Sequence, residues 1–300
     1  MSYSKIAGRF SKEFFLESNG FSRQFVFKKN RTKAEFNLLK NSLLEKVKEA
    51  RKTHKTMGSR VLFHHLNIEE VGINRFEKLV SEAGLSVKTK RKRIVTTNGI
   101  HEDFDKNLIS GKTLNAINQV IAGDITYVQT IEKTYYVFTL KDMYSRRIVG
   151  LWGSDRMYAK NAVKALKQAI LLRGASIKNC IHHSDAGGQY KSNIYKNILK
   201  INGLQMSIAE NCLQNGMAEQ LNGIIKNGYL ETDIKNVNDL NQKLKKIKRL
   251  LNQERPVKAL GYKTPVEFEE WLKEQEKPPE LGLYDFKIVE PNFMGDFFKA

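Results

Sequence analysis

Three carboxylates in separate parts of the sequence could act together in metal-dependent chemistry. Asp185 closely follows the strand-forming residues 177–182 and precedes the glycine pair Gly187–Gly188, a pattern that aims a carboxylate from a strand end into an open site. Asp124 lies upstream among strand-forming residues, and Glu219 lies downstream. Mg²⁺ prefers oxygen ligands, and two ions held between such acids support phosphoryl transfer. The sequence therefore predicts Asp124, Asp185 and Glu219 as catalytic residues and metal ligands.

The two-residue repeat of a strand predicts on which face of the strand the Asp124 side chain lies. In an extended segment Asp124 and Thr126 share one face, and Ile125 points to the other. An acid inside a strand-rich segment is costly to bury without a counter-charge. A salt-bridged edge acid is the alternative, but a metal ligand explains the position of Asp124 better, given the two other acids.

Glu219 can be placed by helix geometry, at about 100° per residue. Asn222, Gly223 and Lys226 fall on its side of the helix. The opposite side is apolar and would pack on a sheet; it comprises Met217, Leu221, Ile224 and Ile225. An ordinary surface glutamate is the alternative, and Glu210 is a rival third acid. Glu210 ranks second because it lacks the neighbouring Asn-Gly and Lys.

Five motifs in a fixed order resemble those of one family. The matching segments are Asp124–Tyr127, Asp142–Gly150, His183–Tyr190, Ala218–Lys226, and finally Glu254–Pro256 with Leu260–Tyr262 and Thr264–Pro265. Together they resemble the catalytic reading frame of a bacterial insertion-sequence transposase of the IS-three family, in the DDE (retroviral-integrase) superfamily. The resemblance extends from about residue 18 to about residue 270.

This resemblance implies an enzyme, a DDE transposase that cleaves DNA strands and transfers them in transposition and integration. It implies Mg²⁺ as cofactor, with Mn²⁺ able to substitute and two ions per site, and no covalent protein–DNA intermediate. The partners it implies are the DNA of element ends and target, a second copy of the chain on paired ends, and an upstream-frame helix-turn-helix protein or frameshift fusion. The chain would then be the downstream frame.

The sequence departs from the family pattern at three positions near the motifs. Ala186 stands where the family usually has Arg or Gln, Ile121 where an aromatic is usual, and Val257 where His is usual. None of these changes removes a predicted metal ligand. A catalytically decayed, transposase-derived DNA-binding protein or regulator remains the alternative function, and an RNase H-type nuclease without joining activity is a third.

Composition favours a polyanionic partner. The 300 residues include 51 Lys and Arg against 32 Asp and Glu, a net charge of +19, which points to nucleic acid. Two cysteines, Cys180 and Cys212, have neither the spacing of a zinc site nor a disulfide framework. No long apolar run or signal-peptide pattern is present. We expect a bacterial cytoplasmic, nucleoid-associated protein that does not enter the membrane.

Periodic apolar residues predict helices at residues 35–53, 59–66 and 74–83, the last ending at Gly84. Together they resemble a helix-turn-helix unit that would bind DNA; a plain helical hairpin is the alternative. A basic run follows and is expected to contact phosphates, or else to be a solvated linker. The residues predicted to contact DNA are Lys88, Lys90, Arg91, Lys92, Arg93, Lys226 and Arg255, with Arg146, Arg147 and Lys258 as weaker candidates. His183 could orient a phosphate or be structural.

The catalytic region alternates strands and helices. Strands are predicted at residues 125–130, 134–140, 147–152, 177–181 and 205–208, and helices at 158–172, 192–202, 213–230 and 238–252, the last capped by Asn238. The resemblance implies that this order is an RNase H-like integrase core, a mixed five-stranded sheet flanked by helices (α/β), preceded by a small all-α helix-turn-helix-like region. The expected domains are 1–93 (helical, DNA-binding), 94–118 (linker), 119–275 (core) and 276–300 (tail). The tail carries aromatics expected to dock on a partner or the core.

Overall fold

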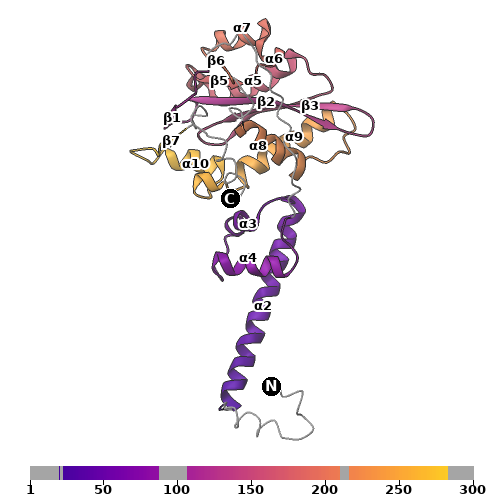
Figure 1. The fold of residues 1–300 in the computed structure, drawn as a ribbon, viewed down its shortest axis with the longest axis vertical. Coiled ribbons are helices and arrows are strands. Elements are labelled where there is room, and N and C mark those ends of the chain that lie inside the picture. Colours follow the sequence, from indigo (N-terminus) through magenta and orange to yellow (C-terminus); the bar gives the residue numbers. More distant parts are fainter. Residues whose placement is uncertain (1–19, 21–22, 88–106, 210–215, 283–300) are drawn as a thin grey trace, which may run out of the picture. The chain divides into compact units, whose positions relative to one another are not determined.

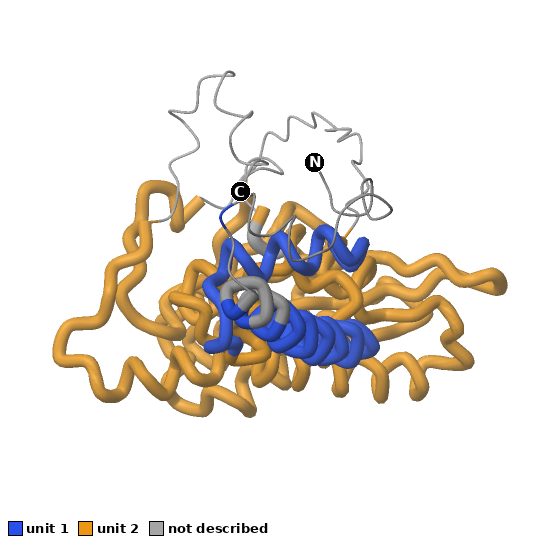
Figure 2. The backbone as a smooth tube through the Cα atoms, turned by 90° about the horizontal axis from the view of Figure 1, so that it is seen from below, with its two compact units in different colours: residues 1–53, 68–86 blue, residues 54–67, 87–300 orange. Residues whose placement is uncertain are grey.

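A computed structural model of the chain describes residues 20, 23–87, 107–209 and 216–282. The chain divides into two compact units (Figure 2), one of residues 1–53 and 68–86 and the other of residues 54–67 and 87–300. The basic run, Glu210, Cys212 and the tail aromatics lie outside the described residues. In the described parts, no helix is both long and apolar enough to cross a membrane.

The described residues of the first unit form two helices, α2 (Arg23–Thr53) and α4 (Ile73–Glu82). Leu43 and Val47 of α2 recur four residues apart and are buried, as are Phe76, Leu79 and Val80 of α4, so each helix has one apolar face. Two contacts add to this packing. Arg75 lies 4.1 Å from the centre of the Phe36 ring, and Lys46 pairs with Glu70 at 3.0 Å.

Both predicted helices of this unit are present, with different limits at the start of α2. That helix begins at Arg23, twelve residues before the predicted start at residue 35. Gly84 follows α4 with a φ of +69°, the left-handed conformation expected of a helix-terminating glycine. The third predicted helix, α3 (Ser59–His65), belongs to the second unit.

The second unit contains the predicted mixed five-stranded sheet, in the order β4-β3-β2-β5-β6. The first three strands are β2 (Val120–Gln129), β3 (Thr134–Asp142) and β4 (Ile148–Ser154), which pair antiparallel as a meander. The last two are β5 (Ile181–Ser184) and β6 (Gln205–Ile208), which run parallel to β2. Parallel pairing requires crossover connections, and helices supply them. The predicted fold class is confirmed.

Helices cover both faces of this sheet (Figure 1). On one face lie α5 (Ala159–Arg173) and α7 (Asn193–Ile201), which share a buried core with Ile121 and Phe138. On the other lie α8 (Gly216–Gly228) and α9 (Val237–Gln253), which share a second core with Tyr135 and Val137. Side chains along β3 point in turn into one core and then into the other. The strand is therefore buried almost throughout.

The sequence-based limits were wrong at several elements. The strand expected at 177–181 starts only at Ile181, because a 3₁₀ turn occupies Gly174–Ile177 and Asn179 takes a φ of +66°. The cap of α9 is Asn236, not Asn238; its side chain accepts from the backbone N–H of Asp239 at 2.9 Å. Short elements were missed altogether: α6 (Gly188–Lys191), the 3₁₀ turn Lys258–Leu260, and the paired strands β1 (Thr113–Leu114) and β7 (Leu281–Gly282).

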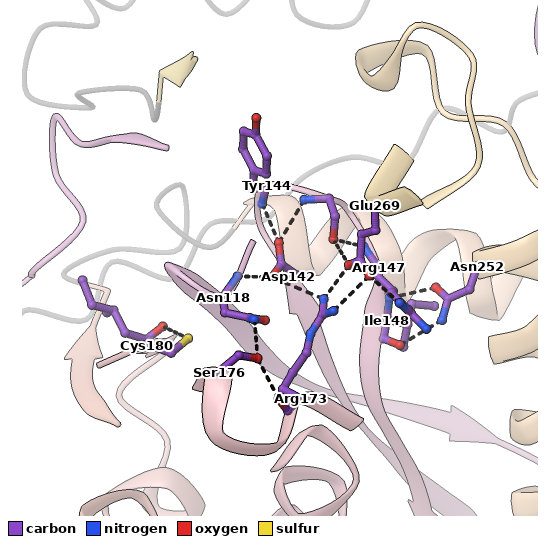
Figure 3. Close-up of polar contacts among 12 residues, drawn as sticks. Asn118, Asp142, Tyr144, Arg147, Ile148, Arg173, Ser176, Cys180, Asn252 and Glu269 are labelled. Atoms are coloured by element: carbon purple, nitrogen blue, oxygen red, sulfur yellow. Dashed lines mark hydrogen bonds and ion pairs between the residues drawn. The ribbon is translucent and has the colours of Figure 1, made fainter. Parts of the chain in front are cut away.

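A missed helix, α10 (Pro265–Leu272), begins with a capping box between Thr264 and Glu267. It carries Glu269 into a buried ionic cluster (Figure 3). Arg173 of α5 forms two hydrogen bonds with Glu269, at 2.6 and 2.9 Å, and Arg147 also pairs with it. Asp142 lies 3.5 Å from Arg173. Two arginines and two carboxylates therefore balance in charge and join α10, α5 and the end of β3.

Asp142, the first residue of the second motif, is engaged in the turn that follows β3. Its carboxylate accepts hydrogen bonds from the backbone N–H groups of Asn118, Tyr144 and Ser145, at 2.8 to 3.0 Å. The residue is fully buried. Its oxygens thus organise the turn that follows β3.

Candidate active site

The pairing of β2 with β5 brings the two aspartates to adjacent positions. Gly123 is the partner of Ser184 in the last pair of this parallel ladder. Asp124 is the next residue of β2, and Asp185 is the residue that follows β5 at its carboxyl end. Ligand sites in sheets with parallel strands lie at the carboxyl ends of those strands. Asp124 and Asp185 therefore lie side by side, although they are far apart in the sequence.

Asp124 lies within β2, on the face covered by α8. Val120 and Ala122, which alternate with it, are buried, and Asp124 is half-buried. Its Oδ2 accepts a hydrogen bond from Nδ2 of Asn222 on α8, at 2.6 Å. Asn222 stood in the third sequence motif but had been given no role. Its carboxylate contact depends on the packing of α8 against β2.

Asp185 begins the loop that follows β5. Its Oδ1 accepts from the backbone N–H of Gly187 at 3.2 Å. A Cβ atom on Gly187 would lie 3.0 Å from that same oxygen, tight enough to force the carboxylate to shift. The glycine therefore permits the loop to close around the carboxylate.

Glu219 lies in the first turn of α8 and is exposed. Leu221 and Ile225 are buried in the second core, as the apolar stripe predicted. The N-terminal end of a helix carries partial positive charge, so a glutamate there is favourable. Gly223, one turn further, has open space around it: a Cβ built there would have no atom within 4 Å.

The three acids influence one another electrostatically. The pKa of Asp124 is raised to about 7, mainly by burial, then by the charge of Asp185 and least by the charge of Glu219. Hydrogen bonds, including the one from Asn222, act in the opposite direction and lower this pKa. Burial raises the pKa of Asp185, and burial followed by the charge of Asp185 raises that of Glu219. No ion pair among the described residues involves any of the three. Their mutual repulsion is thus uncompensated by protein cations in the described parts.

The three side chains do not form a closed ligand cluster. Among the described residues, no group of three His, Cys, Asp or Glu side chains is arranged to hold one metal ion. The neighbouring pair of Asp124 and Asp185, with Glu219 within electrostatic range, leaves most coordination positions of an ion to other ligands. That arrangement suits ions that keep several waters and bind substrate phosphates.

Buried aromatic residues lie behind the aspartates. His183 is fully buried and its Nδ1 pairs with the hydroxyl of Ser207 at 2.9 Å, so it is a structural histidine rather than a phosphate ligand. His182 pairs through Nε2 with the Tyr195 hydroxyl at 2.8 Å. The Tyr190 ring lies 5.5 Å from His182 and 5.3 Å from Tyr195. The Tyr190 hydroxyl is buried and has no hydrogen-bond partner among the described residues.

Two tyrosine-to-phenylalanine variants should therefore differ in stability. Tyr195→Phe removes the hydroxyl that pairs with His182 and should lower the free energy of unfolding by about 1 kcal/mol. Tyr190→Phe removes an unpaired hydroxyl and should leave that free energy unchanged or raise it by up to ~1 kcal/mol. Urea unfolding of both variants would measure the difference. Equal losses in the two variants would contradict the assignment of the hydrogen bond.

The residues predicted to contact DNA have different surroundings. Lys226 is half-buried, with its ammonium 4.4 Å from the centre of the exposed Tyr127 ring. Arg255 does not project freely, because its guanidinium donates to the Tyr229 hydroxyl at 3.1 Å. Of the weaker candidates, Arg147 is engaged with Glu269. The basic run from Lys88 to Arg93 lies outside the described residues.

Two family matches lie within the second unit, both to the integrase core domain. They span residues 115–211 and 203–265. The matched residues include strands β2 to β6, helix α8, which carries Glu219, and helix α9, which packs on the same face of the sheet. The sheet order, the covering helices and the adjacent aspartates thus define an integrase core.

Several proteins similar in sequence to this chain come from bacterial insertion sequences. The insertion element IS600 uncharacterized 31 kDa protein of Shigella sonnei is 36% identical over 185 residues, which cover 60% of this chain and 68% of that one. The transposase InsF for insertion sequence IS3A of Escherichia coli (strain K12) is 40% identical over 104 residues, covering 34% and 36% of the two chains. Among solved structures, the HTLV-2 integrase catalytic core domain in complex with magnesium matches with a TM-score of 0.42 and 21% identity, over 51% of this chain and 97% of that chain.

The chain belongs to the IS-three family of insertion-sequence transposases, in the DDE (retroviral-integrase) superfamily. It is an enzyme of the polynucleotidyl transferase class.

Proposed function

We propose that this transposase uses divalent metal ions to cleave DNA strands at the ends of its element and to join them to target DNA. The observation that supports this most directly is the β2–β5 register, because it brings Asp124 and Asp185 together at the end of the shared ladder. Under this proposal Asp124, Asp185 and Glu219 are the catalytic residues and the metal ligands.

The donor set fits Mg²⁺, with Mn²⁺ as a substitute and two ions per site. Carboxylate oxygens suit hard cations, and burial together with the charge of Asp185 raises the pKa of both Asp124 and Glu219, so a bound cation would relieve a real electrostatic cost. The bound ions would supply Lewis-acid stabilisation of the attacking and leaving oxygens. Asp124 and Asp185 would hold them between the strands, and Glu219 would complete the site from α8.

The remaining side chains would prepare this site. Asn222 would fix the rotamer of Asp124 through its hydrogen bond. The open space at Gly223 would let a DNA backbone approach α8, and Lys226 would lie one turn further along the helix. No serine or tyrosine nucleophile is required in this chemistry. Among the other predicted contacts, we retain Lys88, Lys90, Arg91, Lys92 and Arg93 as phosphate contacts.

We further propose the surroundings in which the enzyme works. DNA is its substrate, and the net charge of +19 favours that partner. A multimer on paired element ends and an upstream-frame helix-turn-helix protein, or a frameshift fusion with it, would complete the assembly. Its place would be the bacterial cytoplasm, in association with the nucleoid. The helical residues within 1–93 would bind DNA, and residues 94–118 would link them to the core.

Glu219→Gln tests the proposal, because it keeps the shape of the side chain and removes its charge. We expect excision of the native element in a host cell to fall by at least ~10²-fold, the size of effect seen when one group that stabilises a transition state is lost. DNA binding in a mobility-shift assay should be unchanged. The matched control is Glu231→Gln, which alters an exposed glutamate paired with Lys55 and should retain wild-type excision.

The upstream frame is supplied in every arm of this experiment. Excision by Glu219→Gln at the wild-type level would remove Glu219 from the site. If neither wild type nor variant forms circles or joined ends while DNA binding persists, the protein is a decayed or regulatory DNA-binding protein instead.

A further inference from the structure

A polar cluster at the far end of α8 lies away from the three acids. Tyr229 directly follows α8, and its hydroxyl lies 2.8 Å from Nδ1 of His54. Arg255 donates to the same hydroxyl at 3.1 Å. Nε2 of His54 lies 3.6 Å from a carboxylate oxygen of Glu254, and the backbone carbonyl of Glu254 accepts from Nδ1 of His65 at 2.8 Å. We call these five residues the clasp.

The chemistry of these groups fixes the direction of the hydrogen bonds. A guanidinium can only donate, so the Tyr229 oxygen accepts from Arg255 and its own O–H is free to donate to Nδ1 of His54. His54 then carries its proton on Nε2, toward Glu254. Burial, and the positive charges of His65 and Arg255, lower the pKa of His54 to about 4, so the ring is neutral at physiological pH. His54 is 2% exposed, and its ring packs edge-on against those of His65 and Tyr229.

Close packing reinforces the clasp at the end of α8. A Cβ atom on Gly228 would lie 2.2 Å from the Thr56 hydroxyl, so any larger residue there would force the Thr56 side chain to move. Thr56 thus approaches the last residue of α8, and His54 and Arg255 both bond to Tyr229, the residue that follows the helix.

The segment that supplies His54 and His65 has an unusual connection. Residues 54–67 belong to the second unit, but they lie in the sequence between the two parts of the first unit. His54 directly follows α2, which ends at Thr53. Glu219 lies in the first turn of α8, at the other end of the helix, and Asn222, the partner of Asp124, lies at its middle. A single 13-residue helix, α8, therefore separates the clasp from the acids.

We propose that His54 and Tyr229 are positioning residues for the reaction, which hold α8 in the setting that presents Glu219 and Asn222 to the two aspartates. The proposal rests on the proposed function, because it needs Glu219 and Asp124 to be the reacting-site acids. It also gives Arg255 a role in place of DNA contact.

Tyr229→Phe is the main test, since it removes only the shared hydroxyl. In the full chain without metal or DNA, amide hydrogen exchange in residues 216–230 should become at least ~10-fold faster, while exchange in β2 and β3 stays at the wild-type rate. In cleavage of element-end DNA with Mg²⁺, kcat should fall ~10- to 100-fold with KM for DNA unchanged, because small displacements of reacting groups cost about that much.

Two histidine variants separate positioning from packing. His54→Leu fills the space without an acceptor and should reproduce the loss seen in Tyr229→Phe. His54→Asn places an oxygen near the position of Nδ1 and should retain kcat within ~3-fold of wild type, since it can still accept from Tyr229. The double variant Tyr229→Phe with His54→Leu should be no worse than either single variant, because both remove one interaction. Lys55→Met, which breaks an exposed ion pair of the same segment, should match wild type.

The exchange experiment needs no catalysis, so it stands even if Glu219→Gln shows that the proposed function is wrong. Wild-type exchange in α8 for Tyr229→Phe would overturn the clasp. Faster exchange in α8 with an unchanged kcat would overturn the positioning role. Equal losses in His54→Asn and His54→Leu would show that the space is filled for packing alone, which also overturns it.

Discussion

Replacing Asp124 with asparagine is expected to abolish strand cleavage and, without metal, to stabilise the protein at neutral pH. Asparagine keeps the shape of the side chain and can still accept from Asn222. It removes the negative charge that a divalent ion needs, so cleavage should fall by ~10³-fold or more. It also removes the repulsion that, with burial, raises the pKa of Asp124 to about 7.

The pH dependence of this gain follows from the sign of that shift. An unfolded aspartate loses its proton near pH 4, whereas the folded Asp124 keeps it until about pH 7. The carboxyl therefore carries no penalty below pH 4, and stability is lost as the pH rises from about 4 to about 7. Above pH 7 the ionised group costs up to about 4 kcal/mol, which the asparagine avoids.

Thermal unfolding in EDTA at several pH values between 4 and 8 would measure this effect. The Tm of Asp124→Asn should exceed that of wild type increasingly across this range, and added Mg²⁺ or Mn²⁺ should stabilise wild type more, because the ions bind the folded state. Asp155→Asn, in the exposed loop after β4, is the control and should follow wild type. A variant Tm below that of wild type at pH 8 would contradict the argument.

Glu269→Gln should have the largest effect on stability. Glu269 is 7% exposed and its carboxylate accepts from Arg173 at both oxygens, with Arg147 as a further partner (Figure 3). Without that charge, Asp142 is the one carboxylate of the cluster left to balance two arginines. Loss of one partner from a buried ion pair costs about 3 to 5 kcal/mol. The Tm should fall by ~10 °C or more, measured by calorimetry in the full chain.

A double-mutant cycle separates loss of charge from loss of packing. In Arg173→Met with Glu269→Met both charges leave together, so the double variant should be at least ~2 kcal/mol more stable than the sum of the single changes predicts. Glu267→Gln changes a neighbouring glutamate of α10 in the capping box and should cost about 1 kcal/mol or less. Additive single changes would mean that Arg173 and Glu269 act independently.

Local sequence patterns were sufficient to predict which faces of α8 and β2 are buried and which carry the acids. The apolar stripe of α8 placed Leu221 and Ile225 against the sheet, and the strand period placed Asp124 opposite Ile125. These patterns repeat within a few residues and depend on burial of one face. Limits were less predictable: Asn179 takes a left-handed conformation that delays β5, and a capping box starts α10 where no helix was expected.

Contacts between distant residues followed no local pattern. His183 had been weighed as a phosphate ligand, and only the pairing of β5 with β6 brings it to Ser207. Arg255 had been predicted to contact DNA, and only the packing at the end of α8 brings it to the Tyr229 hydroxyl, which also bonds to His54. Glu269 had been given no role, and packing of α10 places it between two arginines.

The sequence by itself determined the family, the order of strands and helices, and the three acids proposed to do the chemistry, because residue types and short-range periods are written along the chain. Only the tertiary structure decided that Asp124 and Asp185 are neighbours, that Asn222 bonds to Asp124, and that His54 meets Tyr229 at the end of α8. Strand register and helix packing bring together residues that are dozens to hundreds of positions apart. Those pairings are fixed by burial of the whole core rather than by any local segment.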